Sequence, residues 1–277
     1  MPSTTKRKTR TALITGASSG IGEALAGCFA AGGFDLVLVA RSTGKLDALA
    51  RTLASTHGVR VRVEPADLAQ PGAPETLAAR LRRGRLHIDI LVNNAGVLEH
   101  GAFVAMPPAR HLELIGLNVA GLTAMLAHFA PAIVARGHGR ILNVASIAAF
   151  QAVPSLATYA ATKAYVLSLT ESPADELRGS GVSVTALCPG FTATNMITAA
   201  TVGNPAMATL PSFLVGEAAA VAAEGYAACM AGEVIRVPGV VNQAVALASR
   251  TSPRWLLRRM FGSVGRRTIR RPLDPDK

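Results

Sequence analysis

The sequence predicts an α/β protein built on one doubly wound parallel sheet, with helices on both faces. Three observations predict this fold class. Short apolar runs alternate with longer segments of helical character. The apolar runs are continuous rather than interrupted by polar residues, which is typical of strands buried on both faces. The length of 277 residues, half of them hydrophobic, suits a single domain with a large core.

Six strands and five helices follow from this rhythm in chain order. We expect strands at residues 12–15, 36–40, 59–63, 88–92, 141–145 and 182–187. We expect helices at residues 20–31, 44–56, 73–83, 111–136 and 158–178. Pro173 lies inside the last helix and should kink or open it, because proline has no backbone N–H to donate.

Charge divides the chain into a neutral body and two basic tails. The net charge is +11, of which residues 1–10 carry +4 and residues 250–277 carry +7, so residues 11–249 are neutral. We expect a disordered tail at 1–10, one folded domain at 11–249 and a basic amphipathic extension at 250–277. No nucleic-acid partner is expected, since its basic stripe would lie on the folded body.

The C-terminal extension has an apolar side and a basic side. Trp255, Leu257 and Phe261 lie on one side of an expected helix, and Arg258 and Arg259 lie toward the other. This pattern fits a peripheral helix attracted to an anionic membrane surface. A helix packed on the body or on a partner subunit has the same pattern and is favoured, so membrane contact stays open.

The cysteine pattern indicates a reducing compartment, and the apolar segments bear on whether the chain is secreted or inserted in a membrane. Cys28, Cys188 and Cys229 are widely spaced and form no CxxC pair, so neither a disulfide framework nor a metal site is expected. The first ten residues lack the apolar stretch of a secretory signal. Residues 114–135 are uncharged over a membrane-spanning length, but a buried helix has the same pattern and is favoured. We expect a cytoplasmic protein, with membrane association as the alternative.

A glycine-rich turn, TGASSGIG at residues 15–22, follows the first expected strand and opens the first helix. Glycines let the backbone approach a pyrophosphate, whose charge then lies against the positive end of the helix dipole. In a doubly wound pattern this turn indicates a bound dinucleotide. The expected contacts are Gly16, Ser18, Ser19, Gly20 and Ile21.

The end of the second expected strand bears on which dinucleotide is bound. Folds that prefer NAD commonly place an acid there to hold the ribose hydroxyls. Here the strand is followed by Arg41, and Lys45 comes a turn later. Because a guanidinium pairs well with a 2′-phosphate, NADP is favoured. NAD remains the alternative if Arg41 is only a solvated loop residue.

Two further turns follow strands at the same expected edge of the sheet. Asp67, after the third strand, fits either an adenine contact or a turn cap. The sequence NNAG follows the fourth strand, where Asn94, Ala95 and Gly96 would let the backbone lie close to a cofactor. An ordinary asparagine-glycine turn is the alternative.

Tyr159 and Lys163 are four residues apart and share one face of the last expected helix. A free tyrosine titrates near pH ~10. A neighbouring ammonium and an oxidised nicotinamide would lower the pKa of Tyr159 and make it a workable acid and base. Ser146, directly after the fifth strand, could hold a substrate oxygen or cap a turn. Asn118, in the long apolar helix, either makes structural hydrogen bonds or orders a water for proton relay.

These motifs, in this order, resemble the short-chain dehydrogenase/reductase family over roughly residues 11–240. The resemblance implies a Rossmann-type, dinucleotide-binding catalytic domain that transfers a hydride between NAD(P)H and a carbonyl or alcohol. It implies Tyr159 as proton donor, Lys163 on the nicotinamide ribose, Ser146 on the carbonyl and Asn118 in the relay. It also implies a helix that packs against a partner subunit, so a homo-oligomer is an open expectation that Pro173 puts in doubt.

The segment after the sixth strand completes the resemblance. It implies that Pro189, Gly190, the backbone near Thr192 and the hydroxyl of Thr194 face the cofactor. Residues 186–216 carry no charge, which predicts a substrate loop at about 191–216 that begins with Phe191. Its apolar side chains favour a lipophilic ketone or secondary alcohol as substrate.

One other function class remains compatible with the sequence. A non-catalytic NADP-binding sensor or scaffold would keep the glycine turn. It would not need Tyr159, Lys163 and Ser146 together, and all three are present. We therefore favour an NADP(H)-dependent oxidoreductase in which Tyr159 is the general acid and base.

Overall fold

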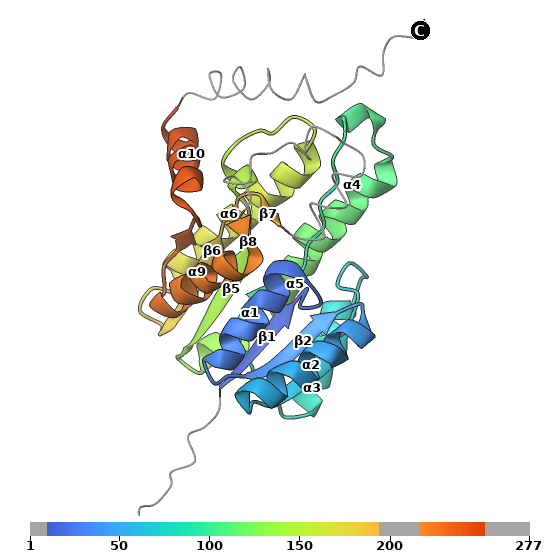
Figure 1. The fold of residues 1–277 in the computed structure, drawn as a ribbon, viewed down its shortest axis with the longest axis vertical. Coiled ribbons are helices and arrows are strands. Elements are labelled where there is room, and N and C mark those ends of the chain that lie inside the picture. The colour runs from blue at the N-terminus through green and yellow to red at the C-terminus, as the bar shows by residue number, and fades with distance from the viewer. Residues whose placement is uncertain (1–9, 194–215, 253–277) are drawn as a thin grey trace, which may run out of the picture.

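The computed structural model describes residues 10–193 and 216–252, which form a parallel sheet between two layers of helices (Figure 1). The sheet has seven strands in the order β3-β2-β1-β4-β5-β6-β9. Every pairing in it is parallel, and the winding reverses between β1 and β4. The predicted doubly wound α/β fold is therefore confirmed.

The elements have the following bounds. The strands are β1 (Thr11–Thr15), β2 (Asp35–Ala40), β3 (Val61–Pro65), β4 (Ile90–Asn93), β5 (Gly139–Val144), β6 (Val182–Leu187), β7 (Thr192–Ala193), β8 (Gly216–Glu217) and β9 (Ile235–Arg236). The α-helices are α1 (Gly20–Ala31), α2 (Thr43–His57), α3 (Ala73–Arg83), α4 (Pro108–Ile115), α5 (Leu122–Ala135), α6 (Ala157–Glu176), α9 (Ala218–Ala231) and α10 (Val240–Thr251). The short helices are η1 (Phe103–Ala105), η2 (Gly116–Gly121) and η3 (Ile147–Phe150).

All six predicted strands and all five predicted helical regions are present. Two differences concern helices. The region expected as one helix consists of α4, the π-helical segment η2 and α5. The expected opening at Pro173 does not occur, because α6 continues to Glu176 and Pro173 lies in its last turn. Pro173 removes one N–H donor, the one that would bond to the Leu169 carbonyl, and only three helical residues follow it.

The sequence missed the elements that follow the predicted substrate loop. Strand β9 is only two residues long, too short for an apolar run to be seen, and it pairs with β6 at the sheet edge. Helix α9 covers the sheet beside α1, and α10 runs to Thr251, two residues beyond the expected end of the domain. The basic tails fall almost entirely outside the described residues.

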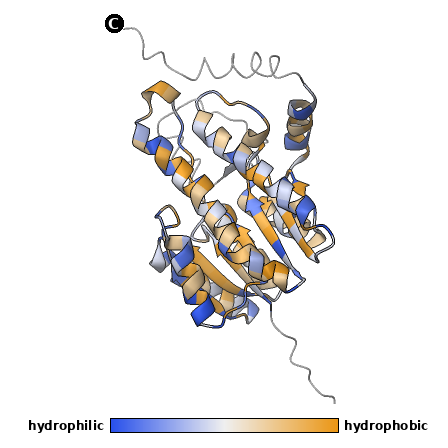
Figure 2. Cartoon of the chain, turned by 180° about the vertical axis from the view of Figure 1, so that it is seen from behind, coloured by the Kyte–Doolittle hydropathy of each residue, from blue (hydrophilic) through white to orange (hydrophobic). Residues whose placement is uncertain are grey.

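The long apolar helical region Pro108–Ala135 is the one stretch among the described residues with the length and hydropathy of a membrane span. Its buried residues Met125, Phe129 and Ile133 pack against strands of the sheet in one of the core clusters. The interpretation as a buried core helix is therefore confirmed. Figure 2 shows orange apolar strands enclosed by helices of mixed hydropathy.

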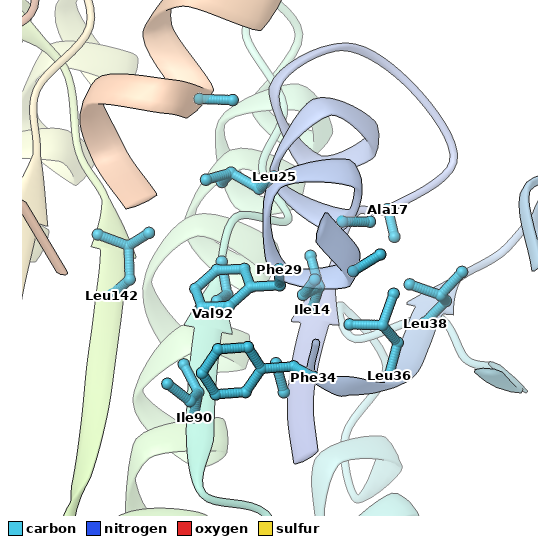
Figure 3. Packing of buried hydrophobic residues seen from close by; sticks show 14 of the residues in the cluster. Ile14, Ala17, Leu25, Phe29, Phe34, Leu36, Leu38, Ile90, Val92 and Leu142 are labelled. Carbon is cyan, nitrogen blue, oxygen red and sulfur yellow. The ribbon is translucent and has the colours of Figure 1, made fainter. Parts of the chain in front are cut away.

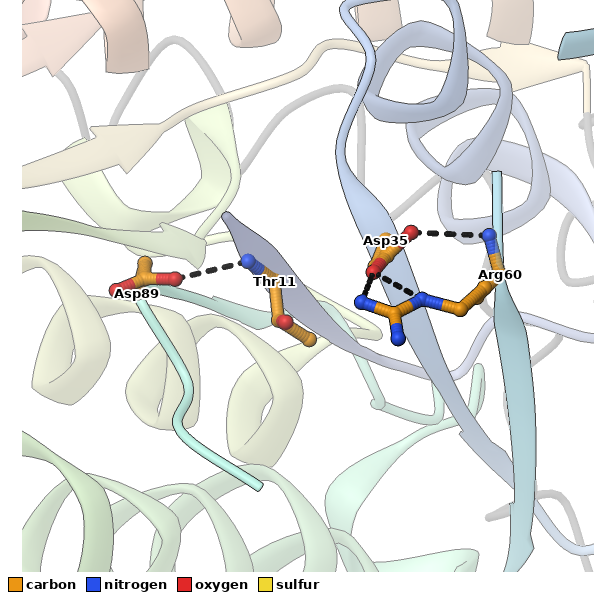
Figure 4. A network of polar contacts seen from close by, with 4 residues as sticks. All are labelled: Thr11, Asp35, Arg60 and Asp89. Atoms are coloured by element: carbon orange, nitrogen blue, oxygen red, sulfur yellow. Dashed lines mark hydrogen bonds and ion pairs between the residues drawn. The ribbon is translucent and has the colours of Figure 1, made fainter. Parts of the chain in front are cut away.

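The core lies on both faces of the sheet. On one face, Phe29 and Phe34 meet edge to face with ring centroids 5.5 Å apart, and Leu25, Leu38 and Leu142 surround them (Figure 3). At the amino ends of the strands, Arg60 donates to Asp35, and Asp89 accepts from the Thr11 backbone N–H (Figure 4). This leaves the carboxyl ends of the strands for the polar residues that the sequence singled out.

Candidate active site

The glycine-rich turn packs directly against the NNAG turn at the carboxyl ends of β1 and β4. Gly16 has a φ of +66°, a conformation that favours glycine. A Cβ added to Gly22 would lie 2.3 Å from the Gly16 carbonyl oxygen and 2.4 Å from Asn94 Nδ2. Asn94 Nδ2 also donates to the carbonyl oxygens of Thr15 and Gly16, at 3.0 and 3.2 Å. The two turns therefore form one tightly packed cradle at the start of α1.

The cradle leaves donors free for a phosphate. Ser18 and Ser19 are half-buried, and their hydroxyls make no hydrogen bond with any described residue. Ser19 precedes the first turn of α1, where backbone N–H groups lack helical partners. Gly20 and Ile21 begin that turn. These residues would hold the diphosphate of a dinucleotide.

The NNAG turn also reaches the predicted catalytic residues. Thr15 Oγ1 accepts from the backbone N–H groups of Asn94 and Ala95, at 2.9 and 3.0 Å, which fixes the turn against β1. A Cβ on Gly96 would lie 3.2 Å from Asn118 Oδ1 and 3.4 Å from Lys163 Nζ. Gly96 thus allows the cofactor cradle, Asn118 and Lys163 to converge.

Asn118 lies in the π-helical segment η2 and is almost fully buried. Its Oδ1 accepts from the Val97 N–H at 2.9 Å, and its Nδ2 donates to the Val97 carbonyl at 2.9 Å. Nδ2 also donates to Thr162 Oγ1 at 3.1 Å. Both functional groups of the amide are therefore satisfied internally, so Asn118 makes the structural bonds that one interpretation required. A role in proton relay stays a prediction.

Tyr159 and Ser146 meet above the end of β5. Tyr159 is buried on the first turns of α6, and Ser146 precedes η3. Ser146 Oγ accepts from the Ala148 N–H at 3.1 Å, so the expected turn cap is present. Burial raises the pKa of Tyr159 to about 12, although a hydrogen bond with Ser146 acts in the opposite direction. The sequence predicts a lowered pKa for Tyr159. Within the chain alone, the loss of hydration on burial outweighs the stabilisation of the phenolate by the hydrogen bond with Ser146.

Lys163 is buried one turn beyond Tyr159, with its Nζ 5.7 Å from the centre of the Tyr159 ring. The Nζ donates to the carbonyl oxygen of Val144 at 2.8 Å. Burial lowers the pKa of Lys163 to about 8, while the nearby Cys188 acts to raise it. The predicted pair therefore shares one face of α6 and points to the same strand ends as Ser146.

Arg41 and Asp67 lie at the carboxyl ends of β2 and β3. Arg41 is exposed, and no described carboxylate forms an ion pair with it. Asp67 Oδ1 accepts from the Ala69 N–H at 3.2 Å, so the turn-cap interpretation is realised. An adenine contact by Asp67 remains a prediction.

The segment after β6 lies beside Ser146. The Pro189 carbonyl accepts from the Ile147 N–H at 2.9 Å. A Cβ on Gly190 would lie 2.5 Å from the Asn242 side chain of α10, so this helix packs closely on the segment. Phe191 pairs its carbonyl with the Gly216 N–H, and the buried Thr192 begins β7. Thr194 and most of the expected substrate loop lie outside the described residues.

Sequence reasoning missed two contributors to the site. Thr162 Oγ1 accepts from Asn118 and donates to the Tyr159 carbonyl at 2.7 Å, linking η2 to α6. Its position between Tyr159 and Lys163 was the available signal. The backbone carbonyl of Val144, which holds Lys163, carries no sequence signal. Among residues 10–193 and 216–252, no cluster of three His, Cys, Asp or Glu could hold a metal ion.

Comparisons with known proteins show which family the chain belongs to. Residues 10–204 match the family described as short chain dehydrogenase. Oxidoreductase UcpA of Escherichia coli strain K12 is 38% identical over 188 residues, which cover 68% of this chain and 71% of that protein.

Two solved structures extend the likeness to nearly the whole chain. A short-chain dehydrogenase from Sphingobium yanoikuyae in complex with NADPH is 35% identical, with a TM-score of 0.78, over 97% of this chain and 99% of that one. A bulky-bulky ketone specific alcohol dehydrogenase from Comamonas testosteroni is 30% identical, with a TM-score of 0.73, over 98% of both chains. This chain belongs to the short-chain dehydrogenase/reductase family of NAD(P)-binding oxidoreductases, enzymes that act on CH–OH groups and the corresponding ketones.

Proposed function

We propose that this enzyme is an NADP(H)-dependent oxidoreductase for lipophilic ketones and secondary alcohols, with Tyr159 as general acid and base. The observation that carries the proposal is the surroundings of Tyr159. Its side chain packs in an apolar cluster with Leu114, Ala148, Leu156 and Ala160. Val97, Leu98, Met106 and Val153 pack against this cluster from the loops after β4 and η3. A substrate that reaches Tyr159 therefore meets apolar surface.

The polar groups at Tyr159 suit carbonyl reduction. The bound nicotinamide supplies the hydride. Ser146 Oγ can donate to the carbonyl oxygen, and the Tyr159 hydroxyl can pass its proton to that oxygen as negative charge develops. Lys163 then offsets the charge of the phenolate from one helical turn away. Because burial raises the pKa of Tyr159, the chain itself keeps the phenol protonated, which is the state that a proton donor requires.

The substrate class can be tested by comparing two ketones with NADPH as reductant. We expect a bulky aromatic or alicyclic ketone to be turned over with a higher kcat/KM than a charged keto acid of similar size. Burial of several extra carbon atoms against the apolar cluster favours it by about 0.8 kcal/mol for each CH₂. A preference for the keto acid would refute the lipophilic assignment while leaving the family assignment intact.

Arg41 supports the choice of NADP. We expect Arg41→Ala to raise the KM for NADPH by roughly 10- to 100-fold, since hydrogen bonds to a charged group contribute about 1.5–3 kcal/mol. The KM for NADH should stay nearly constant, because NADH has no 2′-phosphate. The matched control is Lys45→Ala, another exposed cation in the first turn of α2, which should have a smaller effect. If KM rises equally for NADPH and NADH in Arg41→Ala, Arg41 contributes only general positive charge and does not recognise the 2′-phosphate.

The pKa of Lys163 predicts an alkaline limit to turnover. Because this pKa is lowered to about 8 from 10.5, the folded enzyme loses the ammonium charge as pH rises through 8. The neutral amine no longer stabilises a phenolate, so we expect kcat for reduction to fall above pH 8 at saturating NADPH. Tyr159, with its pKa raised to about 12, should cause no further fall in kcat below pH 10. A kcat that stays flat to pH 10 would contradict this assignment.

Two further interactions remain predictions from the sequence. Contact with an anionic membrane surface depends on residues 253–277, which lie outside the described residues. Vesicle flotation of the full chain, with and without anionic lipid, measures it.

A homo-oligomer is supported by an apolar groove of about 380 Å³ beside α4 and α6, lined by residues that include Phe103, Ile115 and Ala161.

A further inference from the structure

A chain of buried side-chain hydrogen bonds crosses the sheet beneath the active site. Asn93 Nδ2 at the end of β4 donates to Asn143 Oδ1 on β5, at 2.9 Å. Asn143 Nδ2 donates to Thr170 Oγ1 on α6, at 3.0 Å. Thr170 Oγ1 in turn donates to the Val166 carbonyl at 2.6 Å. Asn143 and Thr170 are fully buried, so solvent does not compete for these bonds.

This hydrogen-bond chain joins the segments that carry the catalytic groups. Asn93 opens the NNAG turn. Asn143 directly precedes Val144, whose carbonyl holds Lys163 Nζ at 2.8 Å. Thr170 lies seven residues after Lys163, two turns along the same buried face of α6. The bonds therefore fix the position of α6 along β5 at the level where the Lys163 side chain reaches from α6 to β5.

Ordinary apolar packing does not require polar groups at these positions. Leaving one partner of a buried hydrogen bond unsatisfied costs about 1–3 kcal/mol, whereas replacing both by apolar groups can be neutral. Because hydrogen bonds are directional, the bonds from Asn93 to Asn143 and from Asn143 to Thr170 favour a single register between β4, β5 and α6. Apolar side chains would allow α6 to slide on the sheet by fractions of an ångström.

We propose that Thr170 and Asn143 are positioning residues for Lys163, acting through the register of α6 on β5. The inference rests on the proposed role of Lys163 and adds residues that do not touch the substrate or the cofactor. Displacement of α6 would lengthen the bond from Lys163 Nζ to the Val144 carbonyl and admit water beside the ammonium. The Lys163 side chain lies between Tyr159 on its own helix and Cys188 after β6. After such a displacement it would be better hydrated.

Thr170→Val tests this proposal, because valine has the shape of threonine and lacks the hydroxyl. The direct readout is an NMR titration of the lysine side chains in the protein without added nucleotide. The chain has five lysines, of which Lys163 is the buried one among the described residues. We expect the pKa of Lys163 to move from about 8 toward 10.5 in Thr170→Val. Thr170→Ser, which keeps the hydroxyl, should restore the original value.

Turnover and stability separate positioning from simple stabilisation. We expect kcat to fall about tenfold in Thr170→Val with a nearly unchanged Kd for NADPH, since small misplacements of catalytic groups carry such losses. The matched control is Thr185→Val on β6, a fully buried threonine whose hydroxyl has no partner among the described residues. It should raise Tm, because a buried hydroxyl without a partner is removed, and it should leave the pKa of Lys163 and kcat unchanged.

The possible results distinguish failure of the positioning proposal for Thr170 from failure of the proposed role of Lys163. If Thr170→Val lowers Tm but leaves both the pKa of Lys163 and kcat as in the parent enzyme, the positioning proposal is overturned. If Lys163→Met itself retains full turnover, the proposed role of Lys163 is wrong instead. A shifted pKa with a reduced kcat, both restored by Thr170→Ser, supports the proposal.

Discussion

Replacing Tyr159 with phenylalanine should lower kcat for ketone reduction by roughly 10³-fold, within the range that general acid catalysis provides. The change removes one hydroxyl and keeps the ring that packs against Leu156 and Ala160. The fold and the nucleotide site should therefore survive, with Tm and the Kd for NADPH close to those of the parent enzyme. Turnover is followed by the ultraviolet absorbance of reduced nicotinamide, and NADPH binding by its fluorescence.

A second tyrosine on the same helix supplies the matched control. Tyr165 is partly exposed, and its hydroxyl pairs with Thr123 Oγ1 at 2.9 Å, away from Ser146 and Lys163. Tyr165→Phe should leave kcat within about twofold of the parent value, because an exposed hydrogen bond of this kind contributes only about 1 kcal/mol to stability. If both variants turn over at the parent rate, the proton comes from elsewhere. Only a parent protein that binds NADPH and turns over no ketone would favour the non-catalytic sensor.

Gly22→Ala should prevent tight binding of the nucleotide. The added methyl would lie 2.3 Å from the Gly16 carbonyl oxygen and 2.4 Å from Asn94 Nδ2. Because the first of these atoms is backbone, relief requires the glycine turn and the start of α1 to move apart. We expect the Kd for NADPH to rise by at least about 100-fold, the scale of losses when a positioned site is displaced by about 1 Å. Isothermal titration calorimetry measures it.

Gly27→Ala is the control for the same helix. A Cβ at Gly27 meets nothing within 4 Å, and the residue lies in the interior of α1. Alanine is favoured over glycine in a helix by about 0.8–1.0 kcal/mol, so this variant should raise Tm and leave the Kd unchanged. Equal weakening of NADPH binding by both variants would show that the cradle tolerates a side chain at Gly22.

The elements that the sequence predicts well depend on local pattern. Strands β1, β2 and β4 contain unbroken apolar runs, and burial on both faces follows from the doubly wound order. The glycine turn could be recognised because its function depends on the absence of side chains, which is visible in the residue types. Ser146, Tyr159 and Lys163 follow from spacing and from their place after β5.

The features that the sequence did not predict depend on contacts between distant segments. The bonds of Asn118 to Val97 require the loop after β4 to return to η2, across 21 residues. The direction of the pKa shift of Tyr159 is set by how many apolar neighbours the fold places around it, which residue types alone do not give. The link from Asn143 to Thr170 joins a strand to a helix across 27 residues.

The central claim is that hydride moves directly from NADPH to a carbonyl carbon while Tyr159 supplies the proton. Single-turnover reaction of the full chain with NADPH deuterated at the transferred C4 position, followed by mass spectrometry of the product alcohol, tests it most directly. The account predicts one deuterium on the carbinol carbon with the parent enzyme and almost none formed on that timescale by Tyr159→Phe. Product without deuterium, or deuterated product at the parent rate from Tyr159→Phe, would contradict it.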